Sequence, residues 1–199
     1  MRAHLRTAFI GAITVLALIA SPCAGAQSEA SSAGAVSVEK LVTAVAKRTG
    51  KKFLIDPRVR ADVTVIGQDP TSVDYATLLL ILRIHGFSAV EQGGYVQVVP
   101  DANIRQMPVP LATGKESYPD AEYVSRLIAV KNASAAQLVP ILRPLLPQSA
   151  HLVAFPCKNT LLLVDSFANV KRIEQIVRGL DTGGAYTPPS CDGMEKPSG

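Results

Sequence analysis

Histidine is the residue type in this chain most suited to catalysis or metal binding at neutral pH. After the first 26 residues the histidines are His85 and His151, and neither has a Cys, Asp or Glu at metal-ligand spacing. His85 falls at the end of a predicted helix, where a protonated imidazole complements the helix dipole. His151 begins a predicted strand. We therefore expect structural roles for both histidines and no metal site.

Carboxylates are the second group that could carry chemistry. The candidates lie at predicted turns and helix starts, where Asp side chains bond nearby backbone N–H groups: Asp56, Asp62, Asp69 and Asp74. Their positions do not indicate a paired acid and base. Gly93-Gly94 turns a predicted hairpin and does not open a helix, so it does not indicate a phosphate-binding loop. We expect no catalytic residue and no cofactor, and hence no enzyme.

Cysteines and clustered cations complete the reactive residues. Cys157 and Cys191 could form a disulfide in an oxidising compartment, or remain a partly buried thiol and a tail thiol, and the sequence favours the separate thiols. The basic cluster consists of Lys47, Arg48, Lys51 and Lys52. Its simpler interpretation is a solvated helix end with cations near the C-terminal dipole. The alternative is an electrostatic docking patch for an acidic partner domain.

The first 26 residues have the pattern of an export signal. Residues 1–6 are basic, residues 8–20 are almost wholly apolar, and Ala24-Gly25-Ala26 is a small-x-small cleavage site. The apolar stretch is shorter than the ~20 residues that span a bilayer, so a cleaved signal is favoured over an anchor. Cys23 suggests lipoprotein processing as an alternative, but the preceding Pro22 suits that reaction poorly. The pattern predicts export to the bacterial periplasm.

Charge and composition after cleavage favour small globular modules. Loss of Arg2 and Arg6 lowers the net charge from +4 to +2, which is too mild an excess to indicate nucleic-acid binding. Residues 27–35 are small and polar and predict a flexible leader. Proline and glycine interrupt residues 101–121, which predict a linker between two modules. Residues 182–199 carry few apolar residues and predict a disordered tail.

The first predicted module covers residues 36–100 and has the order α-β-β-α-β-β. Apolar residues recur at helical spacing after Ser37, up to Gly50, and β-branched residues mark the strands. The predicted elements are a helix between Ser37 and Gly50, strands over 52–55 and 62–66, a helix between Ser72 and Gly86, and hairpin strands over 87–91 and 95–99. These elements predict an α+β fold with helices packed on a small mixed sheet.

The second predicted module covers residues 122–181 and has the order β-α-β-β-α. Its elements are a strand over 123–130, a helix from Asn132 or Ser134, strands over 151–155 and 160–164, and a final helix capped by Ser166. The first helix should bury Leu138, Ile141, Leu142 and Leu145 on one face, while Pro140 and Pro144 kink or shorten it. The sheet should bury one face under two helices and leave the other open to solvent or a partner.

These patterns resemble the N-terminal domains of secretins. Residues 38–100 resemble the short domain shared by secretins and TonB-dependent receptors, with marks at Ile55-Asp-Pro57, Val63-Thr-Val65, Gly86-Phe87 and Tyr95-Val-Gln-Val98. Residues 127–181 resemble the repeated secretin domain, with marks at Val130-Lys-Asn132, Asn159-Thr-Leu-Leu-Leu163 and Gly179-Leu-Asp181. The tandem order is that of type II secretion secretins, with type IV pilus secretins as near relatives. Family members usually place a strand before the first helix, and here only Ala35-Val36 has strand character.

The resemblance implies a periplasmic protein-binding module of a secretin-type export system, without the pore-forming domain. Its implied partners are an inner-membrane secretion component, the outer-membrane secretin complex, exported substrates and a second copy of the chain; no nucleic acid is implied. The alternatives are a signalling module like that of TonB-dependent receptors and a truncated secretin gene product. For the interface we predict the last hairpin strand, expected at a sheet edge, together with the basic cluster: Tyr95, Val96, Gln97, Val98, Val99, Lys47, Arg48, Lys51 and Lys52.

The export signal predicts a mature N-terminus at Gln27, because signal peptidase cuts after a small-x-small site such as Ala24-Gly25-Ala26. Intact-mass spectrometry of the protein from a periplasmic extract should give the mass of residues 27–199. A mass that retains Met1, or a lipidated Cys23, would contradict this prediction.

Overall fold

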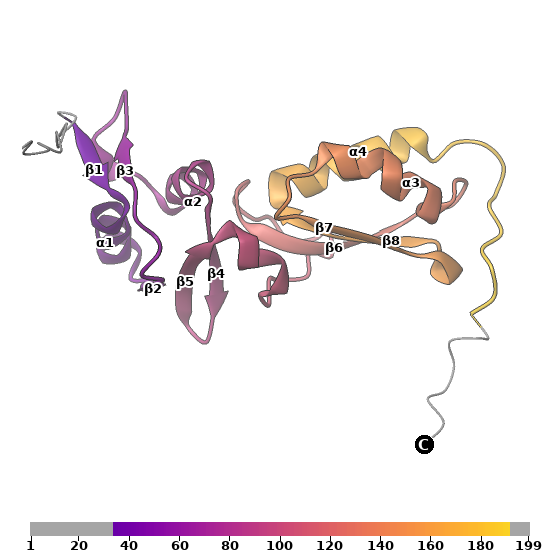
Figure 1. Ribbon diagram of the computed structural model, residues 1–199, viewed down its shortest axis with the longest axis horizontal. Coiled ribbons are helices and arrows are strands. Elements are labelled where there is room, and N and C mark those ends of the chain that lie inside the picture. The colour runs from indigo at the N-terminus through magenta and orange to yellow at the C-terminus, as the bar shows by residue number, and fades with distance from the viewer. Residues whose placement is uncertain (1–33, 192–199) are drawn as a thin grey trace, which may run out of the picture. The chain divides into compact units, whose positions relative to one another are not determined.

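The structure is a computed structural model that describes residues 34–191 (Figure 1). The predicted export signal, the leader up to residue 33 and the last eight residues lie outside the described residues. In residues 34–191, no helix has the length and apolar character needed to cross a membrane. The described residues belong to one compact unit by their contacts.

The first module contains two short helices and five strands. Its elements are β1 (Ala35–Ser37), α1 (Val38–Thr49), β2 (Lys52–Ile55), β3 (Asp62–Thr64), α2 (Tyr75–Ile84), β4 (Phe87–Gln92) and β5 (Tyr95–Pro100). Ser37 caps α1 by accepting a bond from the Lys40 N–H, and Gly50 ends it in the left-handed conformation, as predicted. The strand order is β2-β5-β4, with β2 parallel and β4 antiparallel to β5, while β1 and β3 form a separate antiparallel ribbon.

Two local predictions for this module were wrong. A strand, β1, precedes the first helix, because residues 35–37 pair with β3 although only two of them have strand character. Ser72 does not cap α2. It lies in a 3₁₀ helix, Pro70–Ser72, and Asp74 caps α2 by accepting a bond from the Thr77 N–H at 2.7 Å. The carboxylate of Asp74 is well placed at the positive end of the helix dipole.

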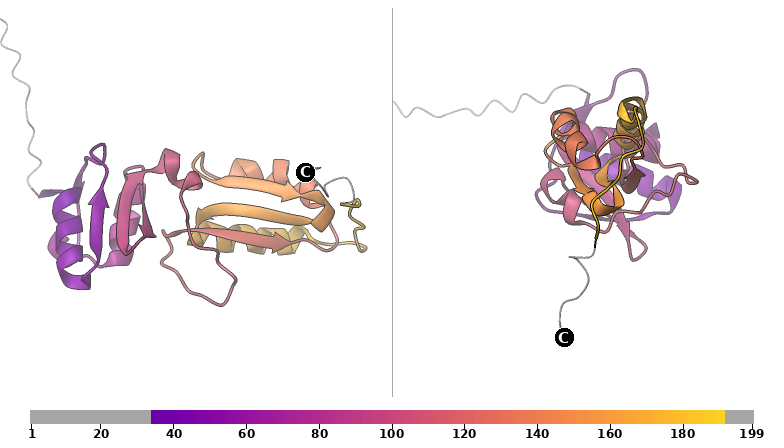
Figure 2. Two further views of the ribbon diagram at one scale, coloured as in Figure 1. Left: turned by 90° about the horizontal axis from the view of Figure 1, so that it is seen from below. Right: turned by 90° about the vertical axis from the view of Figure 1, so that its right-hand side faces the viewer.

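The second module is a three-stranded antiparallel sheet with both helices on one face (Figures 1 and 2). Its elements are β6 (Tyr123–Ala129), α3 (Ala135–Leu142), β7 (His151–Phe155), β8 (Thr160–Ser166) and α4 (Phe167–Leu180), with β8 central. Pro140 lies inside α3, which ends at Leu142 and continues as a 3₁₀ helix, so the predicted shortening is confirmed. Ile141 and Leu145, predicted to be buried, are 55% and 42% exposed, and α3 buries Ala135, Leu138 and Leu142 instead.

Residues 101–121, predicted as a linker, carry structure and buried side chains. A 3₁₀ helix spans Asp101–Gln106, and its Ile104 is fully buried against Val90 of β4 and Tyr123 of β6. Further along, the Ala112 N–H donates to the Ser125 carbonyl, and the Ser125 N–H to the Pro110 carbonyl, both at 2.8 Å. The segment therefore contacts both modules, and we call residues 101–122 the joint. The boundaries proposed from the sequence stay a prediction.

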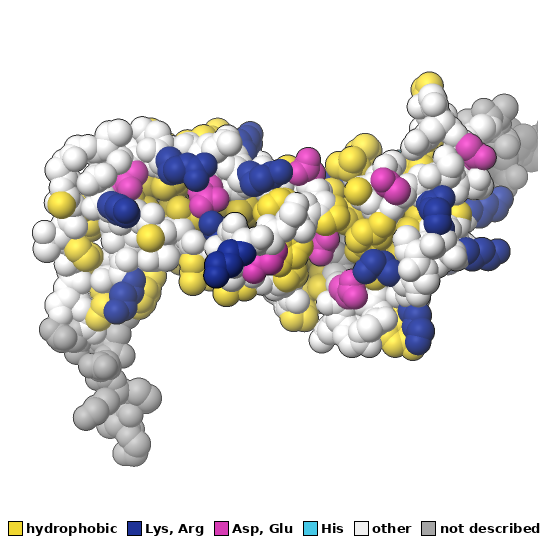
Figure 3. Space-filling model, turned by 180° about the vertical axis from the view of Figure 1, so that it is seen from behind, with side chains coloured by type: hydrophobic (Ala, Val, Ile, Leu, Met, Phe, Trp, Pro, Cys, Tyr) yellow, Lys and Arg dark blue, Asp and Glu magenta, His cyan; other side chains and the backbone are white. Residues whose placement is uncertain are grey.

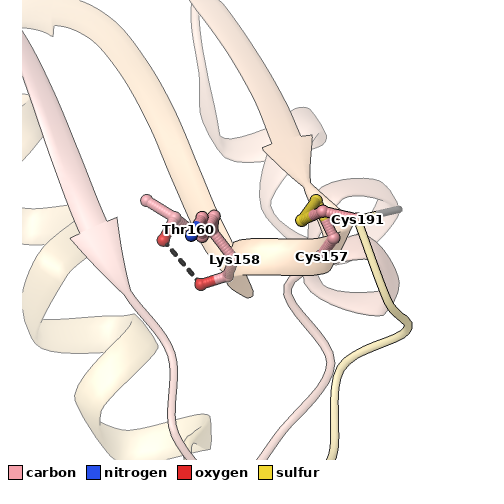
Figure 4. The surroundings of a disulfide bond; sticks show 4 residues. All are labelled: Cys157, Lys158, Thr160 and Cys191. Atoms are coloured by element: carbon pink, nitrogen blue, oxygen red, sulfur yellow. Dashed lines mark hydrogen bonds between the residues drawn. A yellow bond between two sulfur atoms is a disulfide. The ribbon is translucent and has the colours of Figure 1, made fainter. Parts of the chain in front are cut away.

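Residues 182–191, predicted as part of a disordered tail, are tied to the second module. The Asp181 carboxylate accepts bonds from the N–H groups of Lys131, Asn132 and Ala133. The Tyr186 N–H donates to the Lys131 carbonyl. Cys157 and Cys191 form a disulfide, the arrangement that the sequence favoured less (Figure 4). The turn that carries Cys157 is shaped by a bond from the Thr160 hydroxyl to the Lys158 carbonyl.

The disulfide should be the main tie of the tail, because it joins Cys191 covalently to the turn that carries Cys157. In Cys191→Ser we expect rapid proteolytic cleavage between residues 182 and 190, with the second module itself resistant. The free energy of unfolding should fall by no more than about 4 kcal/mol, which is the chain-entropy value for a loop of this length. The loss stays below this value because removal of the disulfide frees the tail in the folded state as well as in the unfolded state.

Limited proteolysis with mass spectrometry, beside a thermal melt, measures both effects. Cys157→Ser and the reduced wild-type protein should reproduce the Cys191→Ser pattern. A Cys191→Ser protein cleaved no faster than the oxidised wild type would show that other contacts hold the tail.

Candidate partner-binding surfaces

The strand predicted as a binding edge, β5, is the centre of its sheet. Val96 and Val98 are 1% and 0% exposed, and β5 pairs with β2 on one side and β4 on the other. The prediction that β5 lies at a sheet edge was wrong. Its hairpin partner β4 pairs with one side of β5, and β2 pairs in parallel with the other side. The backbone of Tyr95, Val96, Gln97, Val98 and Val99 is therefore not free for a partner strand.

The basic cluster is divided among intramolecular contacts. Arg48 donates to the Thr71 carbonyl, and Lys51 forms an ion pair of 2.7 Å with Glu91 and lies over the Tyr75 ring. Lys52 lies over the Tyr95 ring, while Lys47 is exposed. On the face drawn in Figure 3, Lys and Arg side chains are scattered among acidic and apolar ones. The cluster therefore does not present one free basic patch, which favours the simpler interpretation of a helix end.

The aspartates that were weighed for catalysis mostly hold turns and helix starts. Asp56 Oδ1 accepts bonds from the Arg58 N–H and guanidinium, and these bonds lower the pKa of Asp56 to about 2. Hydrogen bonds from the N–H and hydroxyl of Thr71 lower the pKa of Asp69, and bonds from the side chain and N–H of Thr77 lower the pKa of Asp74. Within residues 34–191, no group of three or more His, Cys, Asp or Glu side chains could hold a metal ion.

The first candidate surface lies beside the β1–β3 ribbon. Strand β3 pairs with β1 along one side. Along the ribbon and the turn after it, residues 62–66 line a depression of about 320 Å³ with Thr77, Ile81, Ile84 and His85 at and just after α2. Ile66 and Ile84 are 91% and 81% exposed, more than any other large apolar side chain among the described residues. We call this depression, with Ile66 and Ile84, the ribbon groove.

The ribbon groove has the features of a strand-binding site. A two-stranded ribbon offers backbone donors and acceptors along its outer sides, to which an extended partner segment can add a strand. The adjoining α2 side chains would take alternate apolar residues of that segment. The sequence analysis missed Ile66 and Ile84; the signal available was Ile84 lying outside the apolar stripe of its helix.

The second candidate surface is the uncovered face of the second sheet. Leu127, Leu162 and Val153 are aligned across β6, β8 and β7 by the strand register, and Phe155 lies two pairs further along β7, on the same face. Leu127 is 55% exposed, Phe155 44% and Val153 42%. We call these four residues the open sheet face; they line a depression of about 580 Å³. The sequence predicted such an open face but did not predict its apolar character.

Comparison with known protein families matches both modules. Residues 34–98 match the family described as "GspD-like, N0 domain", and residues 125–185 match the "Bacterial type II/III secretion system short domain". Together these two matches cover more than half of the chain.

Comparison with individual proteins agrees. The chain is 34% identical to secretin XcpQ of Pseudomonas aeruginosa over 75% of this chain and 22% of that protein. It is 27% identical to secretin GspD of Vibrio cholerae over 84% of this chain and 26% of that protein. The chain thus spans about a quarter of the length of these relatives. Among solved structures, the Klebsiella pneumoniae type II secretion outer membrane complex of PulD, PulS and the PulC HR domain matches with a TM-score of 0.65 and 28% identity, over 75% of this chain and 26% of the matched chain.

The central position of β5 predicts the effect of a proline in it. Gln97→Pro removes an N–H from a strand with neighbours on both sides, so a ladder bond must be lost. We expect the free energy of unfolding to fall by about 2 kcal/mol or more, the cost of an unsatisfied buried acceptor with its local strain. Chemical denaturation measures it, with Gln97→Thr as the control that keeps the N–H. Equal stability of the two variants would show that β5 is not central.

Proposed function

The chain belongs to the secretin family through its N-terminal domains, and on that premise we propose that it acts by protein–protein contact within a type II secretion system. The observation that carries the proposal is the tandem of two secretin domains in family order, each with an exposed apolar surface. The matched relatives are secretins, which are secretion components, and the prediction that the chain is not an enzyme is confirmed by that membership. The second secretin domain is the reason that we prefer this function to receptor signalling.

We place the working protein in the periplasm, at an outer-membrane secretin complex. The export signal supports this location, as does the chain's homology to the periplasmic domains of outer-membrane secretins. The related PulD was solved in one complex with PulS and the PulC HR domain. By analogy, the partner of the first module is a domain of an inner-membrane secretion component, and exported substrates pass the same domains.

The ribbon groove is the surface that we propose for this partner. It combines a ribbon side with apolar side chains that are otherwise costly to expose to water. Ile66 and Ile84 flank it, and each would bury most of its surface under a partner strand, which is worth about 1.5–3 kcal/mol per side chain. The open sheet face is the surface that we propose for a second copy of the chain, because the exposed Ile141 of α3 and Leu145 just after α3 offer a complementary apolar edge.

Ile84→Glu should weaken binding to the inner-membrane component at least about tenfold, since it places a charge in the apolar centre of the contact. The folded state should be unaffected, because Ile84 is 81% exposed. Isothermal titration with the periplasmic domain of the inner-membrane component from the same secretion operon measures the affinity, and circular dichroism checks the fold.

Leu54→Glu is the matched control, since Leu54 is 52% exposed on β2, outside the groove. Full affinity in the folded Ile84→Glu variant would remove the ribbon groove from the proposal. Absence of binding by the wild type would instead contradict the proposed partner.

A further inference from the structure

The first backbone N–H groups of α4 donate to acceptors that belong neither to the helix nor to its cap residue, Ser166. Helix starts leave backbone N–H groups without helical acceptors. The Phe167 N–H donates to the Glu122 carbonyl at 2.8 Å, and the Ala168 N–H to the Asp120 carbonyl at 3.0 Å. Lys171 on the next turn forms an ion pair of 2.8 Å with Asp120. The end of the joint is therefore bound to the first turn of α4.

The cap residue of α4 is used for a different contact. Ser166 is fully buried, and its hydroxyl makes no capping bond to the helix. Instead, its Oγ accepts a bond of 2.6 Å from Nη1 of Arg83, which lies in the last turn of α2 in the first module. Among the side-chain hydrogen bonds of residues 34–191, the Arg83–Ser166 bond is one that joins α2 directly to the second module.

A guanidinium beside a helix N-terminus faces the positive end of the helix dipole, which is unfavourable without a nearby negative charge. Asp165 supplies that charge. It is 0% exposed, and its carboxylate accepts bonds from the Ser166 N–H and the Asn169 side chain. Burial raises the pKa of Asp165, and the positive charge of Arg83 is one of the influences that oppose the rise. Arg83 and Asp165 thus stabilise each other across Ser166.

The remaining contacts of the joint are apolar. Ile104 packs between Val90 of the first module and Tyr123 of the second, and Ala121 joins the core of the first module. Burial of apolar surface keeps two parts together but is not directional. A charge-assisted hydrogen bond to a fixed, buried acceptor is directional and short.

We propose that Arg83 is a positioning residue that fixes the orientation of the first module on the second, with Ser166 at the N-terminus of α4 as its seat. The apolar joint brings the modules together, and the Arg83–Ser166 bond selects one angle between them. The two modules then behave as one rigid body, so that a partner bound to the first module holds the second in a defined direction. This inference does not depend on which partner binds.

The test compares the orientation of the two modules in solution by residual dipolar couplings on the mature chain. One alignment tensor should fit the couplings of both modules in the wild type. Arg83→Met keeps the apolar stem of the side chain but removes the donor, and should require two different tensors. Ser166→Ala removes the acceptor from the opposite side and should give the same result, since its hydroxyl does not cap α4.

Arg48→Met is the matched control, because Arg48 also donates through Nη1 to an oxygen, but within the first module. It should keep a single tensor. The double variant Arg83→Met/Ser166→Ala should be no more mobile than either single variant, because both remove the same bond. Chemical shifts of the core residues show whether each module stays folded. Should Arg83→Met disturb its own module, Ser166→Ala decides.

A single tensor in folded Arg83→Met and Ser166→Ala would overturn the proposal and assign the orientation to the apolar joint. Two tensors in the wild type would also overturn it, since the modules would then not form one rigid body.

Discussion

Two helices cover only one face of the three-stranded sheet in the second module, and this geometric constraint leaves its other face open. Strand register places Leu161 and Leu163 of β8 on the covered face and Leu162 on the other. The side chains aligned with Leu162 are themselves apolar, which is an arrangement that a monomer stabilises poorly. In the first module, β3 of the β1–β3 ribbon has strand pairing on one side only among the described residues. Each module therefore exposes large apolar side chains: Ile66 and Ile84 in the first, and Leu127, Val153 and Phe155 in the second.

Long-range polar contacts, rather than local caps, hold the helix starts of the second module. Asn159 adopts a left-handed conformation with φ of 45°, which Asn tolerates better than most residues. Its buried side chain accepts a bond from the Ala135 N–H and donates to the carbonyls of Val130 and Ala133. Loss of this amide would leave three backbone groups without partners in the core, which is costly because buried polar groups need hydrogen bonds. The start of α3 thus depends on a residue 24 positions away.

This dependence explains how much could be predicted from the sequence. Apolar periodicity located the helices and most strands, because side-chain spacing is a local signal. Ser134 and Ser166 were correctly placed before α3 and α4, yet neither hydroxyl caps its helix. At α3 the side chain of the distant Asn159 accepts the bond from the Ala135 N–H, and at α4 the Ser166 hydroxyl accepts a bond from Arg83. The central position of β5 was missed for a related reason. The parallel pairing of β2 with β5 joins residues more than forty positions apart, and no local pattern encodes it.

The candidate surfaces show the same limit. Exposed Ile66 looks like a core residue in the sequence, since side-chain type alone does not report burial, and only the position of Ile84 outside its helix stripe gave a signal. In the joint, prolines and glycines are typical of a linker, while its Ile104 packs between Val90 and Tyr123. A proline-rich segment loses little chain entropy when it becomes ordered, since proline fixes its own φ angle. A few buried side chains are then enough to hold the segment, and a single directional bond such as that of Arg83 can decide the angle between the modules that it connects.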